Sequence, residues 1–278
     1  MTPLLECREL SVDYGGVRAV DHASLAVEPG QIVGLIGPNG AGKTTFVDAI
    51  SGFVATSTGS LVFDGHDLSD RKPHQRARLG LVRTFQSLEL FDDLSVRDNL
   101  FAASERPPWW RLAGELVWPR LGRTDASAVD DALEALDISD LGDRSPDEIS
   151  QGQRKLVGVA RAIAARPKLL LLDEPASGLD TEESTHLGAR LRGLLDRGIT
   201  ILLVDHDMGL VLDVCHHIFV LDFGRILAAG PPEAIRTDRS VIEAYLGERM
   251  SNPDTPPETP TDEPTAEQGD KPGDEVDS

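Results

Sequence analysis

The stretch QIVGLIGPNGAGKTTFVDAI, residues 31–50, combines an apolar run, a glycine-rich loop and the start of an amphipathic segment. Its loop, Gly37 to Thr44, matches the pattern G-x-x-x-x-G-K-[ST], and it follows a predicted strand and opens a predicted helix. Glycines allow consecutive backbone N–H groups to surround phosphate oxygens without interference from Cβ atoms. This stretch therefore predicts a phosphate-binding loop between a strand and a helix, as part of an α/β fold.

The rest of the chain agrees with that fold class. Apolar runs at 169–173, 200–204 and 217–230 alternate with helical patterns at 152–164, 183–195 and 208–216, which predicts a largely parallel sheet. Alternating segments at 4–14 and 17–27, joined by Gly15-Gly16, and a further strand at 58–65 predict an antiparallel β subdomain. Residues 86–149, together with the start of the following helix, are expected to form a helical subdomain.

Charge and composition restrict the possible partners. The formal net charge is −20, which argues against a nucleic-acid partner. No apolar run approaches the roughly 20 residues that span a bilayer, and the N-terminus does not resemble a signal peptide, so we expect any membrane role to depend on a partner. The two cysteines, Cys7 and Cys215, are predicted to be buried, reduced thiols. Residues 1–250 are expected to form one domain, and the acidic, proline-rich segment 251–278 to be a disordered tail.

Three side chains at predicted strand ends suit phosphate chemistry. Asp173 and Glu174 end the run LLLLDE, and His206 follows the next run, TILLVD. Carboxyl ends of neighbouring parallel strands meet at one edge of a sheet, where ligands bind. We expect Lys43 to reach the β- and γ-phosphates of ATP, Thr44 and Asp173 to hold Mg²⁺, and Glu174 to accept a proton from an attacking water, with His206 beside it.

Six motifs in order make the chain resemble the ABC transporter ATPases. ISQGQ (149–153) resembles their signature, preceded by Tyr14, the phosphate loop and Gln86, and followed by SGLD (177–180) and His206. The resemblance implies a P-loop NTPase (RecA-like) parallel-sheet core with an antiparallel β subdomain and a helical signature subdomain. It also implies that Tyr14 stacks on adenine, that Gln86 contacts the γ-phosphate and Mg²⁺, and that two ATPase domains pack head to tail. The further ATP contacts that it implies are Gly37, Pro38, Asn39, Gly40, Ala41, Gly42, Lys43, Thr44, Thr45, Ser150, Gly152, Gln153 and Asp180. In that arrangement Ser150 and Gly152 hold the ATP of the neighbouring chain. Gln151 departs from the glycine found in many members.

Three longer stretches resemble one subfamily, the ATPases of branched-chain (hydrophobic) amino-acid importers. They are RTFQSLELFDDLSVRDNL (83–100), TILLVDHDMGLVLDV (200–214) and VIEAYLG (241–247). The resemblance implies a second ATPase subunit (a heterodimer, or a homodimer), two transmembrane permeases docked near 88–101, an external solute-binding protein, and a place on the cytoplasmic face of the membrane. Related systems carry urea or short amides, so the sequence leaves the solute open.

Other functions remain as alternatives. The lipopolysaccharide-export ATPases share the YLG end and the histidine switch, and the soluble iron–sulfur assembly ATPases are similar in size. Only about 105 residues separate Lys43 from Ser150, which leaves no room for the long coiled coil of the DNA-repair ATPases. The segment 105–127, which holds all three tryptophans, is interpreted as a local hydrophobic cluster rather than a membrane contact.

Overall fold

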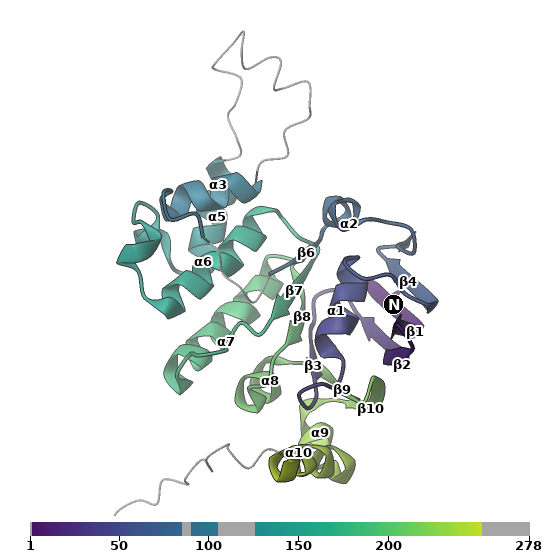
Figure 1. The fold of residues 1–278 in the computed structure, drawn as a ribbon. Coiled ribbons are helices and arrows are strands. Elements are labelled where there is room, and N and C mark those ends of the chain that lie inside the picture. The colour runs from purple at the N-terminus through teal and green to yellow at the C-terminus, as the bar shows by residue number, and fades with distance from the viewer. Residues whose placement is uncertain (1, 85–89, 105–125, 252–278) are drawn as a thin grey trace, which may run out of the picture.

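The computed structural model describes residues 2–84, 90–104 and 126–251 (Figure 1). Three sequence-based expectations lie outside these residues: the role of Gln86, the tryptophan segment up to residue 125, and the tail from residue 252 onward.

A six-stranded sheet forms the centre of the molecule, in the order β10-β9-β3-β8-β7-β6. All neighbouring strands are parallel except the β9–β10 hairpin. The strands are β3 (Ile32–Ile36), β6 (Leu81–Arg83), β7 (Leu169–Asp173), β8 (Thr200–Val204), β9 (His217–Asp222) and β10 (Arg225–Gly230). Strands β3, β7 and β8 are buried along their whole length, and their residues are apolar except for Asp173 and Thr200, because both faces of a parallel sheet are covered. The predicted parallel core is confirmed.

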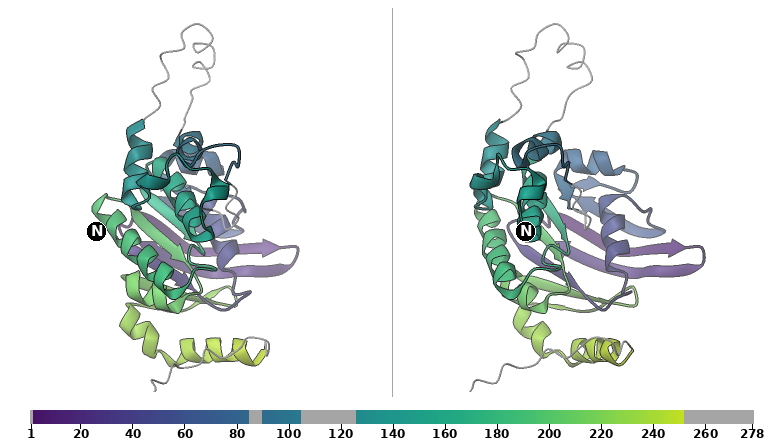
Figure 2. Two further views of the ribbon diagram at one scale, coloured as in Figure 1. Left: turned by 90° about the vertical axis from the view of Figure 1, so that its left-hand side faces the viewer. Right: turned by 60° about the vertical axis from the view of Figure 1, so that its left-hand side comes forward.

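The predicted antiparallel sheet is also confirmed, in the order β2-β1-β4-β5. Its strands are β1 (Leu5–Tyr14), β2 (Val17–Val27), β4 (Thr58–Phe63) and β5 (His66–Asp67). Figure 2 shows the β1–β2 hairpin extending sideways from the rest of the molecule. Helix α1 (Lys43–Ser51) packs in one hydrophobic cluster with strands of both sheets, through residues such as Phe46 and Ile50. The helix that follows the phosphate loop is thus held by both sheets.

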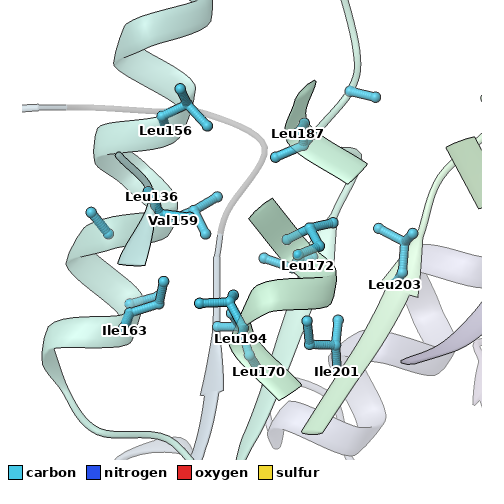
Figure 3. Packing of buried hydrophobic residues seen from close by; sticks show 14 of the residues in the cluster. Leu136, Leu156, Val159, Ile163, Leu170, Leu172, Leu187, Leu194, Ile201 and Leu203 are labelled. Atoms are coloured by element: carbon cyan, nitrogen blue, oxygen red, sulfur yellow. The ribbon is translucent and has the colours of Figure 1, made fainter. Parts of the chain in front are cut away.

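The remaining helices pack on the parallel sheet or on one another. They are α2 (Pro73–Leu79), α3 (Val96–Ser104), α5 (Ala126–Ala135), η1 (Ser139–Leu141), η2 (Pro146–Glu148), α6 (Gln151–Ala164), α7 (Thr181–Asp196), α8 (Met208–Val214), α9 (Pro232–Thr237) and α10 (Arg239–Ser251). Figure 3 shows apolar side chains of α6, such as Leu156 and Ile163, facing Leu170 and Leu172 of β7 with Leu187 and Leu194 among them. Within the described residues, α3, α5, η1 and η2 lie in the region 86–149 that the sequence predicts to be a helical subdomain, and α6 directly follows it.

Burial matches the prediction for the two cysteines. Cys7 and Cys215 are both buried and unpaired, and burial raises the pKa of each thiol, that of Cys215 to about 12. Across the described ranges, none of the helices combines the length and the apolar character needed to cross a bilayer.

Candidate nucleotide-binding site

The phosphate loop connects β3 to α1 and depends on glycine at two points of close approach. Gly37 and Gly42 have φ values of 151° and 101°, in the region that favours glycine. A Cβ atom on Gly37 would lie 2.0 Å from the carbonyl oxygen of Leu221, and one on Gly42 would lie 2.4 Å from that of Ala19. The loop therefore lies directly against the backbone of β9 and of the β1–β2 hairpin, with no space for larger residues.

Lys43 lies inside the curve of this loop. Its side chain is buried, and Nζ donates hydrogen bonds to the carbonyl oxygens of Gly37 (2.6 Å) and Pro38 (2.9 Å). These bonds hold the ammonium group at the inner side of the loop, next to the backbone N–H groups. A cation in this position can bind a phosphate that enters the loop.

The loop opens onto a pocket of about 520 Å³, which we call the phosphate-loop pocket. A volume of this size lies within the usual range for small-molecule sites. Its lining brings the predicted loop residues 39–45, but not Gly37 or Pro38, together with Glu174, and it adds residues of β2 and of the β9–β10 turn. The lining residues are Val17, Arg18, Ala19, Asn39, Gly40, Ala41, Gly42, Lys43, Thr44, Thr45, Glu174, Phe223 and Gly224. Among the described residues, neither Tyr14 nor His206 lines this pocket.

Asp173 ends β7 and is held by an arginine from the neighbouring strand β6. Arg83 Nη2 donates to Asp173 Oδ2 at 2.8 Å, and Arg83 Nη1 donates to Asp48 of α1 and to Ser51 Oγ at 3.1 Å. The guanidinium group thus connects the end of β7 to α1, the helix that follows the phosphate loop. Sequence reasoning missed Arg83; the available signal was a charged residue within the apolar segment GLVRTF.

Of the predicted Mg²⁺ ligands among the described residues, Thr44 lines the phosphate-loop pocket, whereas Asp173 does not and is paired with Arg83. Asp173 supplies a carboxylate and Thr44 a hydroxyl, both hard oxygen ligands. In the described part of the chain, no cluster of three or more histidine, cysteine or acidic side chains could hold a metal ion alone. Mg²⁺ commonly binds through one or two protein oxygens, water and substrate phosphates, so these residues fit the ion only together with a nucleotide.

Glu174 follows Asp173 and has an unusual backbone. Its φ is 49°, which places a non-glycine residue in the left-handed region. Its N–H donates to the carbonyl oxygen of Val204 at 2.7 Å, so the turn after β7 is fixed to the end of β8. Strained conformations of this kind cluster at functional sites. The sequence contained no signal for this conformation.

His206 follows β8, the strand next to β7, as the sequence predicts. Its side chain is exposed, and its Nδ1 lies 3.6 Å from Oδ1 of the buried Asp205, which is longer than a hydrogen bond. Glu174 and His206 follow adjacent strands, and that their side chains lie side by side stays a prediction.

The signature residues lie at the start of α6, in a different pocket. Ser150 caps the helix by accepting from the N–H of Gln153 (3.2 Å), and Gln153 Oε1 accepts from the N–H of Ser150 (2.9 Å). Ser150, Gly152 and Gln153 line a pocket of about 470 Å³, the signature pocket, which shares no lining residue with the phosphate-loop pocket. A Cβ atom on Gly152 would lie 2.6 Å from Glu183 Oε1, the end of a flexible side chain of α7 that could move aside.

Asp180 has a local role in the described structure. It caps α7, accepting from the N–H of Glu183 at 2.8 Å, while its own N–H donates to Glu183 Oε2 at 3.2 Å. Asp180 is not among the residues that line either pocket. The hydrogen bonds of Asp180 and of Ser150 fix two neighbouring helix starts, those of α7 and α6.

Comparison with known proteins identifies the family that this chain resembles. A sequence model of the ABC transporter family matches residues 20–177, and one of the branched-chain amino acid ATP-binding cassette transporters matches residues 225–250. The high-affinity branched-chain amino acid transport ATP-binding protein BraF of Pseudomonas aeruginosa is 39% identical over 88% of this chain and 98% of its own length. The lipopolysaccharide export system ATP-binding protein LptB of Haemophilus influenzae is 36% identical over 89% of this chain and 98% of its own length. A nucleotide-free ATP-binding cassette from an ABC transporter has a TM-score of 0.78 and 29% identity, covering 88% of this chain and 99% of that one.

Proposed function

This chain belongs to the ABC transporter family of ATP-binding proteins, and we propose that it drives the import of branched-chain amino acids. It is an ATP-hydrolysing subunit that powers an ABC importer. The observation that supports the choice of solute is the match of residues 225–250 to the branched-chain amino acid ATP-binding cassette transporters. This segment comprises β10, α9 and most of α10, and lies outside the ABC transporter match at 20–177.

In the proposed mechanism the phosphate loop binds the β- and γ-phosphates of ATP. The backbone N–H groups of the loop residues other than Pro38, together with the ammonium of Lys43, neutralise the phosphate charge. Thr44 and Asp173 would hold Mg²⁺, which when bound spreads the charge developing on the phosphate oxygens. Glu174 reaches the same pocket and accepts a proton from the attacking water. His206, after the adjacent strand, senses or stabilises the γ-phosphate from the side, and Tyr14 stacks on the adenine.

The signature residues act on the ATP of a second ATPase subunit. Ser150, Gly152 and Gln153 line a pocket separate from their own phosphate-loop pocket, which supports an arrangement in which they serve a partner. The N-terminus of α6 presents backbone N–H groups to an anion. A nucleotide held between two chains stabilises their association, and hydrolysis weakens it. Ser150→Arg places a bulky cation at this helix start, and we expect a large loss of ATPase activity in the assembled transporter.

The proposed assembly contains a second ATPase, as a heterodimer or a homodimer, two permeases and an external solute-binding protein, with this chain on the cytoplasmic face. The proposed domain boundaries are those of the sequence, 1–250 for the ATPase domain and 251–278 for the tail. Movement of the ATPase pair passes to the permeases through the helical subdomain.

Affinity purification from the natural host tests this assembly. Tagged Glu174→Gln lacks the proton acceptor and is expected to hold ATP and keep the complex closed, so that partners copurify in mild detergent with ATP. Glu233→Gln, a change at an exposed residue of α9, is the matched control and is expected to recover fewer partners. Recovery of a second ATPase and two multi-span permeases would support the importer.

The same purification separates the proposal from its main alternative. The 36% identity to LptB keeps a lipopolysaccharide exporter as a second candidate. Recovery of an export permease, or of soluble partners alone, would overturn the importer while leaving the ATPase unchanged.

A further inference from the structure

Asp205 is a fully buried carboxylate that has no part in the mechanism above. It directly follows β8, and none of its surface is exposed. Its Oδ1 accepts hydrogen bonds from the N–H groups of His206 (2.8 Å) and Asp207 (3.0 Å), and its Oδ2 accepts from the N–H of Ala176 (3.0 Å). One side chain therefore binds the loop after β8 with one oxygen and the loop after β7 with the other.

A carboxylate this deeply buried is costly unless it is well paired. The three N–H donors satisfy its oxygens, and Lys155 of α6 adds a cation, since both Asp205 and Glu174 interact electrostatically with that lysine. Burial lowers the pKa of Lys155, and the nearby carboxylates oppose that change. The hydrogen bonds and the lysine together compensate the cost of burying Asp205.

The bond to Ala176 bears on the strained residue Glu174. The left-handed conformation of Glu174 persists only if its surroundings hold it. On one side, the Glu174 N–H donates to Val204; on the other, the Ala176 N–H donates to Asp205. Val204 and Asp205 are consecutive, so both bonds attach the Glu174 turn to the same point at the end of β8.

We propose that Asp205 is a positioning residue that sets the distance and orientation between Glu174 and His206 during ATP hydrolysis. The inference rests on the roles proposed above for those two residues. Asp205 touches neither nucleotide nor water in this role; it acts through the two loops that its oxygens join. Misplacement of a reacting group by about 1 Å can cost about 100-fold in rate, so a small shift of either loop is sufficient.

Asp205→Asn tests the proposal with little change in size. The amide keeps one acceptor oxygen and replaces the other with a donor that faces an N–H group. We expect kcat of the purified transporter to fall by about 10- to 100-fold, with KM and the ATP dissociation constant of the chain within about threefold of wild type. A purely structural role would lower thermal stability without this separation of kcat from KM.

A matched control and a double-mutant cycle sharpen the test. Ser184→Ala removes the hydroxyl that donates to Asp207 Oδ2 (2.8 Å), in the same hydrogen-bond network but without contact to Asp205, and we expect kcat near wild type. The double variant His206→Ala/Asp205→Asn should raise the activation free energy by less than the sum of the increases in the two single variants. If Asp205 acts through His206, the loss of His206 already removes part of the effect of Asp205. Asp205→Glu retains two acceptor oxygens and is expected to recover part of the lost rate.

The outcomes separate this inference from the proposed function. Wild-type kcat and KM in Asp205→Asn, with Glu174→Gln inactive, would overturn the positioning role while leaving the proposed function intact. Hydrolysis by Glu174→Gln at the wild-type rate would instead contradict the roles on which the inference rests. If Asp205→Asn does not fold, as judged by ATP binding, Asp205→Ser is measured in its place; wild-type kinetics there would overturn the inference equally.

Discussion

Replacement of Arg83 by methionine gives a strong test of how the site is held together. Arg83 lies between two carboxylates, Asp173 at the end of β7 and Asp48 in α1. The exposed side-chain fractions are 7% for Arg83, 8% for Asp173 and 27% for Asp48. Methionine keeps most of the buried volume but removes the charge, so Asp173 remains as a buried carboxylate without its cation.

The expected loss in the free energy of unfolding follows from the burial of Arg83 and Asp173. Removing one partner of a buried ion pair costs about 3–5 kcal/mol in the free energy of unfolding. Water can solvate the more exposed Asp48, so we place Arg83→Met at the lower end, about 3 kcal/mol. In an Asp173→Asn background the unpaired buried charge is absent, and the same substitution should cost about 1–1.5 kcal/mol, the value of an ordinary hydrogen bond.

Urea denaturation followed by circular dichroism measures both costs. With an m-value of about 3 kcal/mol/M, a loss of about 3 kcal/mol lowers the urea midpoint by about 1 M. Arg239→Met is the control, because Arg239 pairs with Glu243 on the surface, where such pairs contribute about 0–1 kcal/mol. Equal midpoint shifts in the wild-type and Asp173→Asn backgrounds, or a shift no larger than that of the control, would refute the reasoning.

Three further predictions concern other parts of the molecule. Gly42→Ala would place a Cβ atom 2.4 Å from the carbonyl oxygen of Ala19, so ATP affinity measured by fluorescence titration should fall at least tenfold, whereas Gly198→Ala, with a similar positive φ and open space, should leave it unchanged. Arg76 is buried and donates to four backbone carbonyl oxygens, so Arg76→Met should lower the free energy of unfolding by about 3 kcal/mol; a change below 1 kcal/mol in thermal denaturation would contradict this. Asp21 has a pKa held well below its ordinary value by its hydrogen-bond partners, His22, Arg225 and Arg18. A depressed folded-state pKa stabilises the protein at neutral pH and loses that contribution as pH falls, so Asp21→Asn should lower the melting temperature at pH 7, with a difference from wild type that shrinks below about pH 4; a constant difference would count against it.

Much of the fold could be predicted from local sequence. The runs that became β3, β7 and β8 are apolar apart from Asp173 and Thr200, because the sheet is covered on both faces, and the phosphate loop indicated which strand precedes α1. Strand β6 could not be predicted in the same way, since its three residues, Leu81 to Arg83, are too few to show a period.

The hydrogen bonds that hold the site were less accessible to sequence reasoning. Arg83 meets Asp48 and Asp173 across separations of 35 and 90 residues, and Asp205 meets Ala176 across 29. Such pairings depend on strand order, which local patterns do not specify. The left-handed backbone of Glu174 is likewise a consequence of tertiary bonds rather than of its residue type.

Uptake of radiolabelled leucine, isoleucine and valine by the natural host tests the central claim most directly. The chromosomal copy is replaced by Lys43→Ala, with Glu233→Gln as the matched control. Loss of Lys43 removes the ammonium held against Gly37 and Pro38 in the phosphate loop. The account predicts that uptake of at least one of the three amino acids falls to the level of a deletion strain, while the control keeps the wild-type rate. Unchanged uptake of all three, with ATP binding by the purified variant abolished, would contradict the claim that this chain powers branched-chain amino acid import.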